Sequence, residues 1–189
     1  MSLISFIATD KFISFMSDGR VTDTERNEIL TEDYKKILKV NEQIIIGIGG
    51  NYKAAEILQD YVKTFNIHDA KNFAHSLFNE LGNGKVHKEM HIFIGGLDDR
   101  NRIYYTGFSQ GSTELIEINP VYGTNRYGCM ESSVIKKVTN NDLLGKLMDQ
   151  NRRILRVKDA KQIQEKLNAQ VSMIDRSVGT KTFHEYIKK

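Results

Sequence analysis

Hydrophobic residues recur with two different periods along this chain, and each change of period marks a new group of elements. Two apolar segments, residues 3–9 and 12–17, are separated by a short polar tip, which predicts an opening hairpin. Residues 35–40 and 43–50 predict a second hairpin, and the three successive isoleucines in its second arm are typical of a strand covered on both faces. The polar segment between the hairpins, residues 20–34, is interpreted as a loop or an irregular strand.

The pattern then becomes helical. Apolar residues follow helical spacing in residues 51–66 and again in residues 70–78, with Gly82 and Gly84 as a stop signal. The helical pattern returns at Glu131 and includes a helix that begins near Asp159, which is a suitable N-cap residue. The apolar stripe expected on this last helix is Ile163, Leu167, Val171 and Ile174.

Further strands are predicted between the helical regions and at the end of the chain. Strands grouped in blocks argue against alternating βαβ units. We therefore expect one α+β domain over residues 1–189, a four-layer αββα sandwich in which helices cover two stacked antiparallel sheets. Three aromatic residues in one strand are expected in its core rather than on a base-stacking surface: Tyr104, Tyr105 and Phe108. The further strands are expected at residues 91–97, 102–108, 113–119, 124–129 and 182–188.

Composition narrows the class of protein. Hydrophobic residues make up 40% of the 189 residues, enough for a substantial core. The formal net charge of +3 is too small to indicate nucleic-acid binding by itself. One cysteine, Cys129, allows neither an intrachain disulfide nor a multi-cysteine metal site. No apolar run reaches membrane-spanning length, and the first residues lack the features of a signal peptide, so we expect a cytoplasmic protein.

The first residues carry candidate chemistry. Removal of Met1, which is common before a small residue, would make Ser2 the N-terminal residue and place a hydroxyl and a free α-amine on one residue. An α-amine has a pKa of about 7.7–8.0, so it can act as a base near neutral pH. A serine hydroxyl needs such a base before it becomes a useful nucleophile. A chain that retains Met1 is therefore expected to be inactive.

Three further residues fit the same chemistry. Asp18 ends the second arm of the first hairpin, so its backbone is expected close to Ser2. Lys36 opens the third strand, where its ammonium would lower the pKa of the serine hydroxyl while Asp18 orients it. Gly47, near the end of the isoleucine-rich strand, would present a backbone N–H to a developing oxyanion.

Residues 2–21, 33–40 and 43–58 together resemble the start of a proteasome β-subunit, including its bacterial ring-forming peptidase relatives. That family of N-terminal-nucleophile hydrolases has the αββα sandwich and needs no cofactor or metal. The resemblance implies a peptidase of peptides or unfolded proteins, a ring-like homo-oligomer and a possible ATPase partner. It assigns Ser2 as nucleophile, Asp18 and Lys36 as its charged partners and Gly47 as oxyanion donor. It also implies that substrate backbone pairs beside Thr22 and Gly49.

The later part of the chain resembles the family less closely. Cys129 stands where the family usually has a serine, and Ser132 is nearby. Asp175 and Ser177 resemble the accessory aspartate and serine of the family, with a tighter spacing. The nucleophile is serine instead of the commoner threonine.

Other functions remain open at this point. The chain could be a catalytically silent proteasome-like assembly or binding module, or an amidase that acts on a small molecule. The glycines of residues 47–51 could bind a phosphate at a helix N-terminus, although the full phosphate-loop pattern is missing. His87 and His91 would lie about 13 Å apart on a strand, too far for two ligands of one ion. The basic side chains of residues 146–166 are interpreted as a solvated helix face rather than a nucleic-acid surface.

Overall fold

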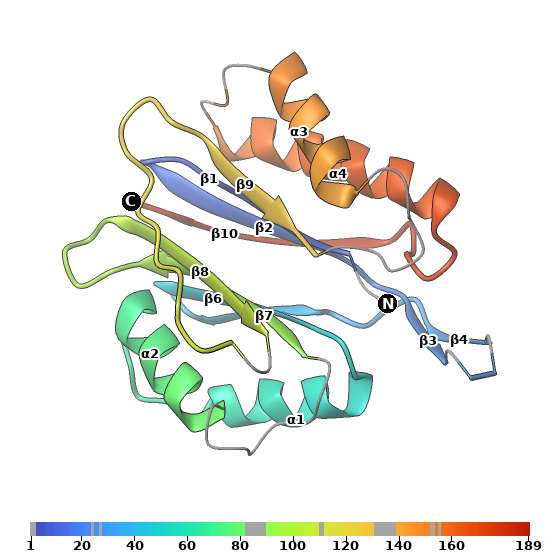
Figure 1. Cartoon of the computed structure of the whole chain (residues 1–189), viewed down its shortest axis with the longest axis horizontal. Coiled ribbons are helices and arrows are strands. Elements are labelled where there is room, and N and C mark those ends of the chain that lie inside the picture. Colours follow the sequence, from blue (N-terminus) through green and yellow to red (C-terminus); the bar gives the residue numbers. More distant parts are fainter. Residues whose placement is uncertain are drawn as a thin grey trace.

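Two four-stranded antiparallel sheets stack face to face, and a pair of helices covers the outer face of each (Figure 1). The computed structural model describes residues 3–23, 25–26, 28–81, 90–109, 112–130, 139–151, 154 and 156–189. Within these residues the chain has a mixed α+β architecture, as the blocks of strands and helices predicted. No helix of the described segments has both the length and the apolar character needed to span a bilayer.

The first sheet has the strand order β10-β2-β1-β9. The predicted opening hairpin is confirmed, with Ile4 opposite Ser17 in antiparallel register. The last strand of the chain pairs with β2, so that Thr182 lies opposite Asp18. This sheet contains β1 (Ile4–Ala8), β2 (Phe12–Asp18), β9 (Arg126–Cys129) and β10 (Thr182–Lys188).

The second sheet has the strand order β5-β6-β7-β8, and each strand is antiparallel to its neighbour. The second predicted hairpin forms its first two strands. The isoleucines of β6 are fully buried because the other sheet covers one face and helices cover the other (Figure 1). This sheet contains β5 (Ile37–Asn41), β6 (Ile44–Gly49), β7 (His91–Leu97) and β8 (Ile103–Ser109).

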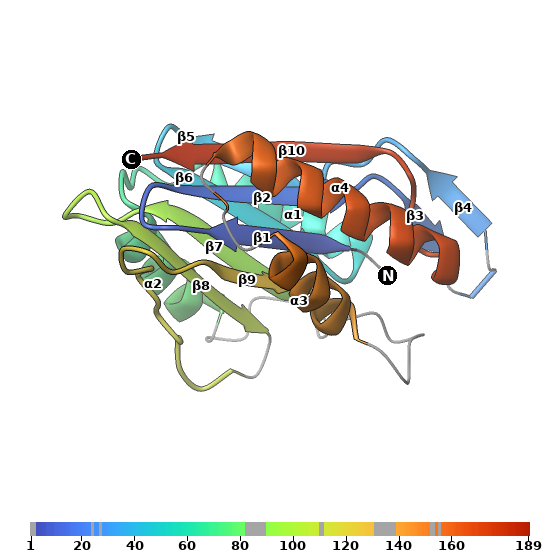
Figure 2. The same cartoon turned by 90° about the horizontal axis from the view of Figure 1, so that it is seen from above.

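A small two-stranded sheet stands apart from the layers. Residues 20–34, interpreted as a loop or irregular strand, include β3 (Val21–Asp23) and β4 (Glu28–Thr31). Figure 2 shows that these strands project beyond the two large sheets on the side of the N-terminus.

The four helices of the described residues follow the predicted helical periods. Their bounds are α1 (Tyr52–Val62), α2 (Ala70–Glu80), α3 (Asn140–Gln150) and α4 (Val157–Ile174). The prediction of Asp159 as N-cap is wrong, because Arg156 occupies that position and the Asp159 carboxylate accepts a hydrogen bond from the Arg156 N–H. The expected start at Glu131 and the stop signals Gly82 and Gly84 lie outside the described residues.

The core has three parts that match the layers. One lies between the sheets around Phe6 and Phe15, one lies under α1 and α2 around Phe73, and one lies under α3 and α4 around Leu167. The expectation that Tyr104, Tyr105 and Phe108 belong to the core is confirmed. The apolar stripe of α4 is buried at Ile163, Leu167 and Val171, whereas Ile174 is 55% exposed.

The strand expected at residues 113–119 does not form. Only Ile118 pairs with a strand, through an isolated bridge to Tyr105. The carbonyl of Ile116 instead accepts a hydrogen bond from the Thr106 hydroxyl, and Asn119 bonds to the Ile103 carbonyl. Because side-chain donors occupy these two carbonyl groups, the segment lies beside β8 without forming a continuous ladder of backbone hydrogen bonds.

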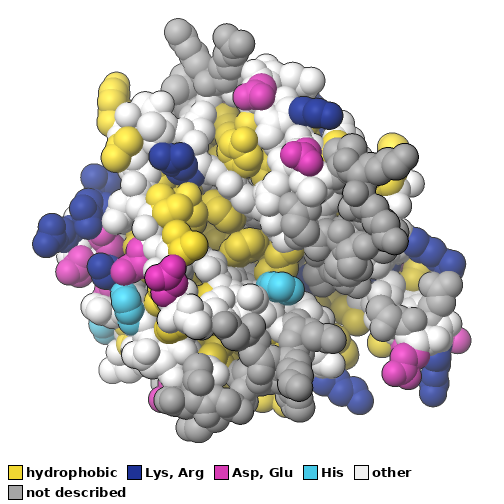
Figure 3. Space-filling model, in the orientation of Figure 1, with side chains coloured by type: hydrophobic (Ala, Val, Ile, Leu, Met, Phe, Trp, Pro, Cys, Tyr) yellow, Lys and Arg dark blue, Asp and Glu magenta, His cyan; other side chains and the backbone are white. Residues whose placement is uncertain are grey.

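The surface drawn in Figure 3 exposes apolar side chains near its middle. In the described part of the basic segment 146–166, Arg156 pairs with Asp159 at 3.0 Å and Lys161 with Glu165 at 3.8 Å, while Lys158 is exposed. Arg152 and Arg153 lie outside the described residues.

A buried polar network joins α4 to the first sheet. Gln164 donates to the Ser5 carbonyl at 3.0 Å, and its Oε1 atom accepts from the Ser14 hydroxyl at 2.7 Å. The Ser14 Oγ atom also lies 2.8 Å from Nε2 of His184 on β10. Because the hydroxyl has one proton, which goes to Gln164, the His184 ring donates to Ser14.

This network predicts a pH-dependent stability. Burial lowers the pKa of His184 below its ordinary value; the positive charge of Lys161 adds to the effect, and Glu185 and Glu165 oppose it. A lowered pKa means that the fold disfavours the protonated ring, so this contribution is complete above about pH 6.5 and is lost as the pH falls below it. Between pH 7.5 and 5.0 we expect urea unfolding to show a loss of stability that His184→Gln removes.

His91, exposed at the start of β7, provides the control. The variant His91→Gln should keep the pH dependence of the wild type. An equal pH dependence in His184→Gln and the wild type would contradict the assignment.

Candidate functional site

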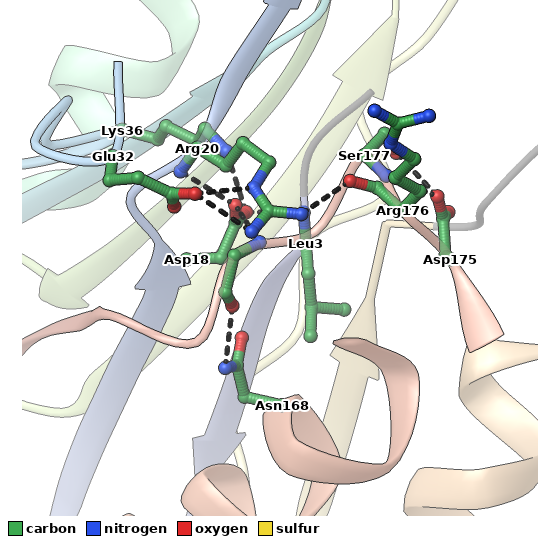
Figure 4. Close-up of polar contacts among 10 residues, drawn as sticks. Leu3, Asp18, Arg20, Glu32, Lys36, Asn168, Asp175, Arg176 and Ser177 are labelled. Carbon is green, nitrogen blue, oxygen red and sulfur yellow. Dashed lines mark hydrogen bonds and ion pairs between the residues drawn. The ribbon is translucent and has the colours of Figure 1, made fainter. Parts of the chain in front are cut away.

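Asp18 and Lys36 form a buried ion pair where β2 ends and β5 is about to begin. The Lys36 Nζ atom lies 2.6 Å from Asp18 Oδ1, and the two side chains are 2% and 0% exposed. The structure therefore brings together the two charged residues that the sequence predicted. The pair lies beside the backbone of Leu3, near the start of the chain (Figure 4).

The Asp18 carboxylate accepts four hydrogen bonds. Its Oδ1 atom accepts from Lys36 and from the Leu3 N–H at 2.9 Å, and Oδ2 accepts from the N–H groups of Arg20 at 2.9 Å and Gly179 at 3.0 Å. Every partner is a donor, which suits the ionised carboxylate because that form only accepts. The site is thus built from the start of β1, the end of β2 and the segment before β10.

Burial lowers the pKa of Lys36 below its ordinary value. The negative charge of Asp18 and the hydrogen bond to it act in the opposite direction, and Glu32 assists Asp18. An amine with a lowered pKa gives up its proton more readily, and such groups gather at reactive sites. The pair therefore combines a fixed negative charge with a cation that can exchange a proton.

A second shell of polar contacts surrounds the pair (Figure 4). The Arg20 guanidinium bonds to Glu32 Oε1 at 2.8 Å and to the Arg176 carbonyl at 2.5 Å. It thereby joins the base of the β3–β4 hairpin to the segment between α4 and β10. Asp175 and Ser177 of that segment bond to one another, with the Ser177 hydroxyl 2.6 Å from Asp175 Oδ1.

The placement of Ser2 lies outside the described residues. Leu3 is the next residue in the chain, and its backbone N–H contacts Asp18 directly. The ion pair therefore contacts the residue that directly follows the predicted nucleophile in the sequence. Ser132 is also outside the described residues.

Gly47 occupies the interior of β6, with Ile37 opposite it on one side and Phe93 on the other. The N–H of Ile48 donates to the Lys36 carbonyl, so the N–H of Gly47 points to the opposite edge, toward β7. This direction does not fit the expected role of Gly47 as an oxyanion donor beside Lys36. Alternation brings the N–H of Gly50 back to the edge where Lys36 lies.

Gly50 follows the last residue of β6 and is exposed. Its φ of 113° belongs to a backbone region that favours glycine. No described residue accepts a hydrogen bond from its N–H. Sequence reasoning missed this residue because the edge toward which an N–H points depends on strand register.

The two residues expected to pair with substrate have different surroundings. Gly49 ends β6 opposite His91, and a Cβ atom there would lie 2.4 Å from the Met130 sulfur. Thr22 lies on β3 opposite Ile29, and its buried hydroxyl has no hydrogen-bond partner among the described residues.

Cys129 is buried at the end of β9, as expected for a small core residue. Both its backbone N–H and its thiol lie within hydrogen-bond distance of Asn141 Oδ1, at 3.0 and 3.4 Å. Asp175 and Ser177 lie on the segment that leads to Gly179, whose N–H contacts Asp18.

The alternative sites of the sequence analysis find limited support. At the start of α1 the Asn51 side chain accepts from the Ala54 N–H, which satisfies one of the groups that an anion would use. His91 is exposed, and His87 lies outside the described residues. Among the residues described, no group of three or more His, Cys, Asp or Glu side chains is arranged to hold a metal ion.

No model of a known protein family matches this chain, and no curated protein matches it at a significant level.

Proposed function

We propose that this chain is an N-terminal-nucleophile hydrolase similar to proteasome β-subunits, which cleaves amide bonds in peptides once Met1 has been removed. The observation that carries the proposal is the buried Asp18–Lys36 pair, bonded to the backbone N–H of Leu3. A buried ion pair is expensive to desolvate and is often no more stabilising than apolar residues would be. Its contact with Leu3, the residue that follows Ser2 in the sequence, fits a catalytic role better than a purely structural one.

The layer order supports the same proposal. Two stacked antiparallel sheets between pairs of helices are the arrangement expected of the N-terminal-nucleophile fold, and the strand ends carry the charged pair (Figure 1). In this proposal the Ser2 hydroxyl attacks the amide carbonyl, and the Ser2 amine accepts its proton. Lys36 and Asp18 set the charge around the hydroxyl, with Lys36 stabilising its deprotonated form.

The oxyanion that develops on the substrate carbonyl needs a donor on the same side as Lys36. We assign this role to the N–H of Gly50, because it emerges at the Lys36 edge of β6 and has no partner among the described residues. The bond between the substrate carbonyl and the leaving amine then breaks, and the leaving amine takes up the proton held by the Ser2 amine. Water hydrolyses the resulting ester on Ser2.

Labelling with an electrophilic peptide tests this proposal. Intact mass should first show loss of Met1, and peptide mapping should then place the adduct on Ser2. Ser2→Thr keeps a hydroxyl and should still be labelled, whereas Ser2→Ala should lose labelling and at least about a thousandfold in peptide hydrolysis. Both variants keep a small second residue and so allow Met1 removal.

Two outcomes would count against the peptidase. Retention of Met1 in protein from its native host would favour a silent module. Undiminished labelling or hydrolysis in Ser2→Ala would show that another residue is the nucleophile.

A further inference from the structure

Asn168 is a buried polar residue that the proposed reaction does not use. It lies on α4, is 3% exposed, and donates from Nδ2 to the Gly179 carbonyl at 3.0 Å. Its Oδ1 atom has no hydrogen-bond partner among the described residues. A buried acceptor without a partner is unfavourable, so an apolar residue would be expected here if the position served packing alone.

Gly179 lies close to the side chains of Glu32 and Arg20. A Cβ atom there would lie 2.5 Å from Glu32 Oε2 and 2.9 Å from Arg20 Cβ. Gly179 therefore makes its polar contacts through its backbone, with its carbonyl bonded to Asn168 and its N–H bonded to Asp18 Oδ2 at 3.0 Å. Figure 4 shows Asn168 reaching from its helix toward this segment, below Asp18.

We propose that Asn168 is a positioning residue for the Asp18–Lys36 pair, which it supports from α4 by fixing the Gly179 backbone against the Asp18 carboxylate. Without Asn168, the Gly179 carbonyl loses its buried donor, and the segment before β10 is free to withdraw its N–H from Asp18. The catalytic consequence rests on the proposed function, whereas the electrostatic consequence does not.

The electrostatic effect has a definite sign. Loss of the Gly179 donor removes an N–H dipole that offsets the negative charge of Asp18, and entry of water reduces the desolvation of Lys36. Both changes favour the protonated amine, so the pKa of Lys36 rises. The other charged groups that act on Lys36 are Glu32, which favours its protonated form, and Arg20, which disfavours it.

An NMR titration of the Lys36 side chain tests the inference in the whole chain. Asn168→Leu removes the donor with little change in size. Asn151→Leu is the matched control. Asn151, the C-cap residue of α3, also donates from Nδ2 to a backbone carbonyl, that of Leu147 at 2.7 Å. We expect the pKa of Lys36 to rise in Asn168→Leu and to stay at the wild-type value in Asn151→Leu, even where both variants lose stability.

Peptide hydrolysis gives a second readout. Under the proposed function, Asn168→Leu should lower kcat about tenfold or more while KM changes little, since a displaced catalytic group affects the chemical step. If no variant and no wild-type sample hydrolyses any peptide, the proposed function fails, yet the Lys36 titration still decides the role of Asn168.

An unchanged Lys36 titration in folded Asn168→Leu would overturn the inference. If that variant does not fold, the wild type supplies the answer through the side-chain amide signals of Asn168. Those signals should shift with the midpoint of the Lys36 titration, and their failure to respond would equally overturn the inference.

Discussion

Replacement of Lys36 by methionine is expected to lower the free energy of unfolding by about 3–5 kcal/mol. The substitution removes the ammonium that lies 2.6 Å from Asp18 Oδ1 and leaves a carboxylate buried without its charged partner. Methionine is close to lysine in length, so lost packing contributes little. Urea unfolding at pH 7.5 measures the effect, and the same variant should abolish labelling of Ser2.

Lys39→Met is the matched control for this prediction. Lys39 pairs with Glu42 at 2.6 Å, but these side chains are 30% and 90% exposed. A solvent-exposed pair contributes about 0–1 kcal/mol. The double variant Lys36→Met, Asp18→Asn should recover part of the lost stability, since no charge is then left buried. A loss in Lys36→Met no larger than that in Lys39→Met would contradict the buried-pair description.

Gly19→Ala should also be strongly destabilising, by about 2–3 kcal/mol. A Cβ atom at Gly19 would lie 2.2 Å from the Glu32 carbonyl oxygen, which is a backbone atom and cannot move aside as a flexible side chain can. Gly19 also donates to the Lys181 carbonyl and accepts from the Tyr34 N–H, so the shift would spread to both neighbouring segments. Thermal and urea unfolding measure the change.

Gly123→Ala separates this clash from ordinary glycine effects. Gly123 has a φ of 79°, but a Cβ atom there would meet nothing within 4 Å. Its replacement should cost about 1 kcal/mol, from backbone strain alone. Equal losses in the free energy of unfolding for the two variants would contradict the close contact between Gly19 and the Glu32 carbonyl oxygen.

Periodicity predicted most of the strands and helices because each buries one face, and the spacing of apolar residues along that face can be seen within a short stretch of sequence. The prediction was wrong for residues 113–119. An alternating pattern shows that a strand is possible, but not that a neighbouring strand will pair with it. At Ile116 the Thr106 hydroxyl takes the carbonyl that a ladder would have used.

The candidate site was predictable only in part, for a related reason. Asp18 and Lys36 follow from their places at strand ends, next to predicted hairpins. Gly50 was missed because the edge toward which each N–H points depends on strand register, and the β5–β6 pairing shifts register between Lys39 and Asn41. Gly179 was missed because its partner Asp18 lies 161 positions away, and no local pattern encodes such a contact.

The pairing of β10 with β2 has a consequence for biosynthesis. A ribosome that has just delivered Lys36 has made both members of the ion pair, but Gly179 and the strand that aligns Thr182 with Asp18 are still to be translated. Until the segment with Gly179 and β10 has been translated, the Asp18 carboxylate lacks this donor and the edge of β2 lacks its partner strand. We therefore expect the proposed peptidase to complete its site only after β10 has been translated.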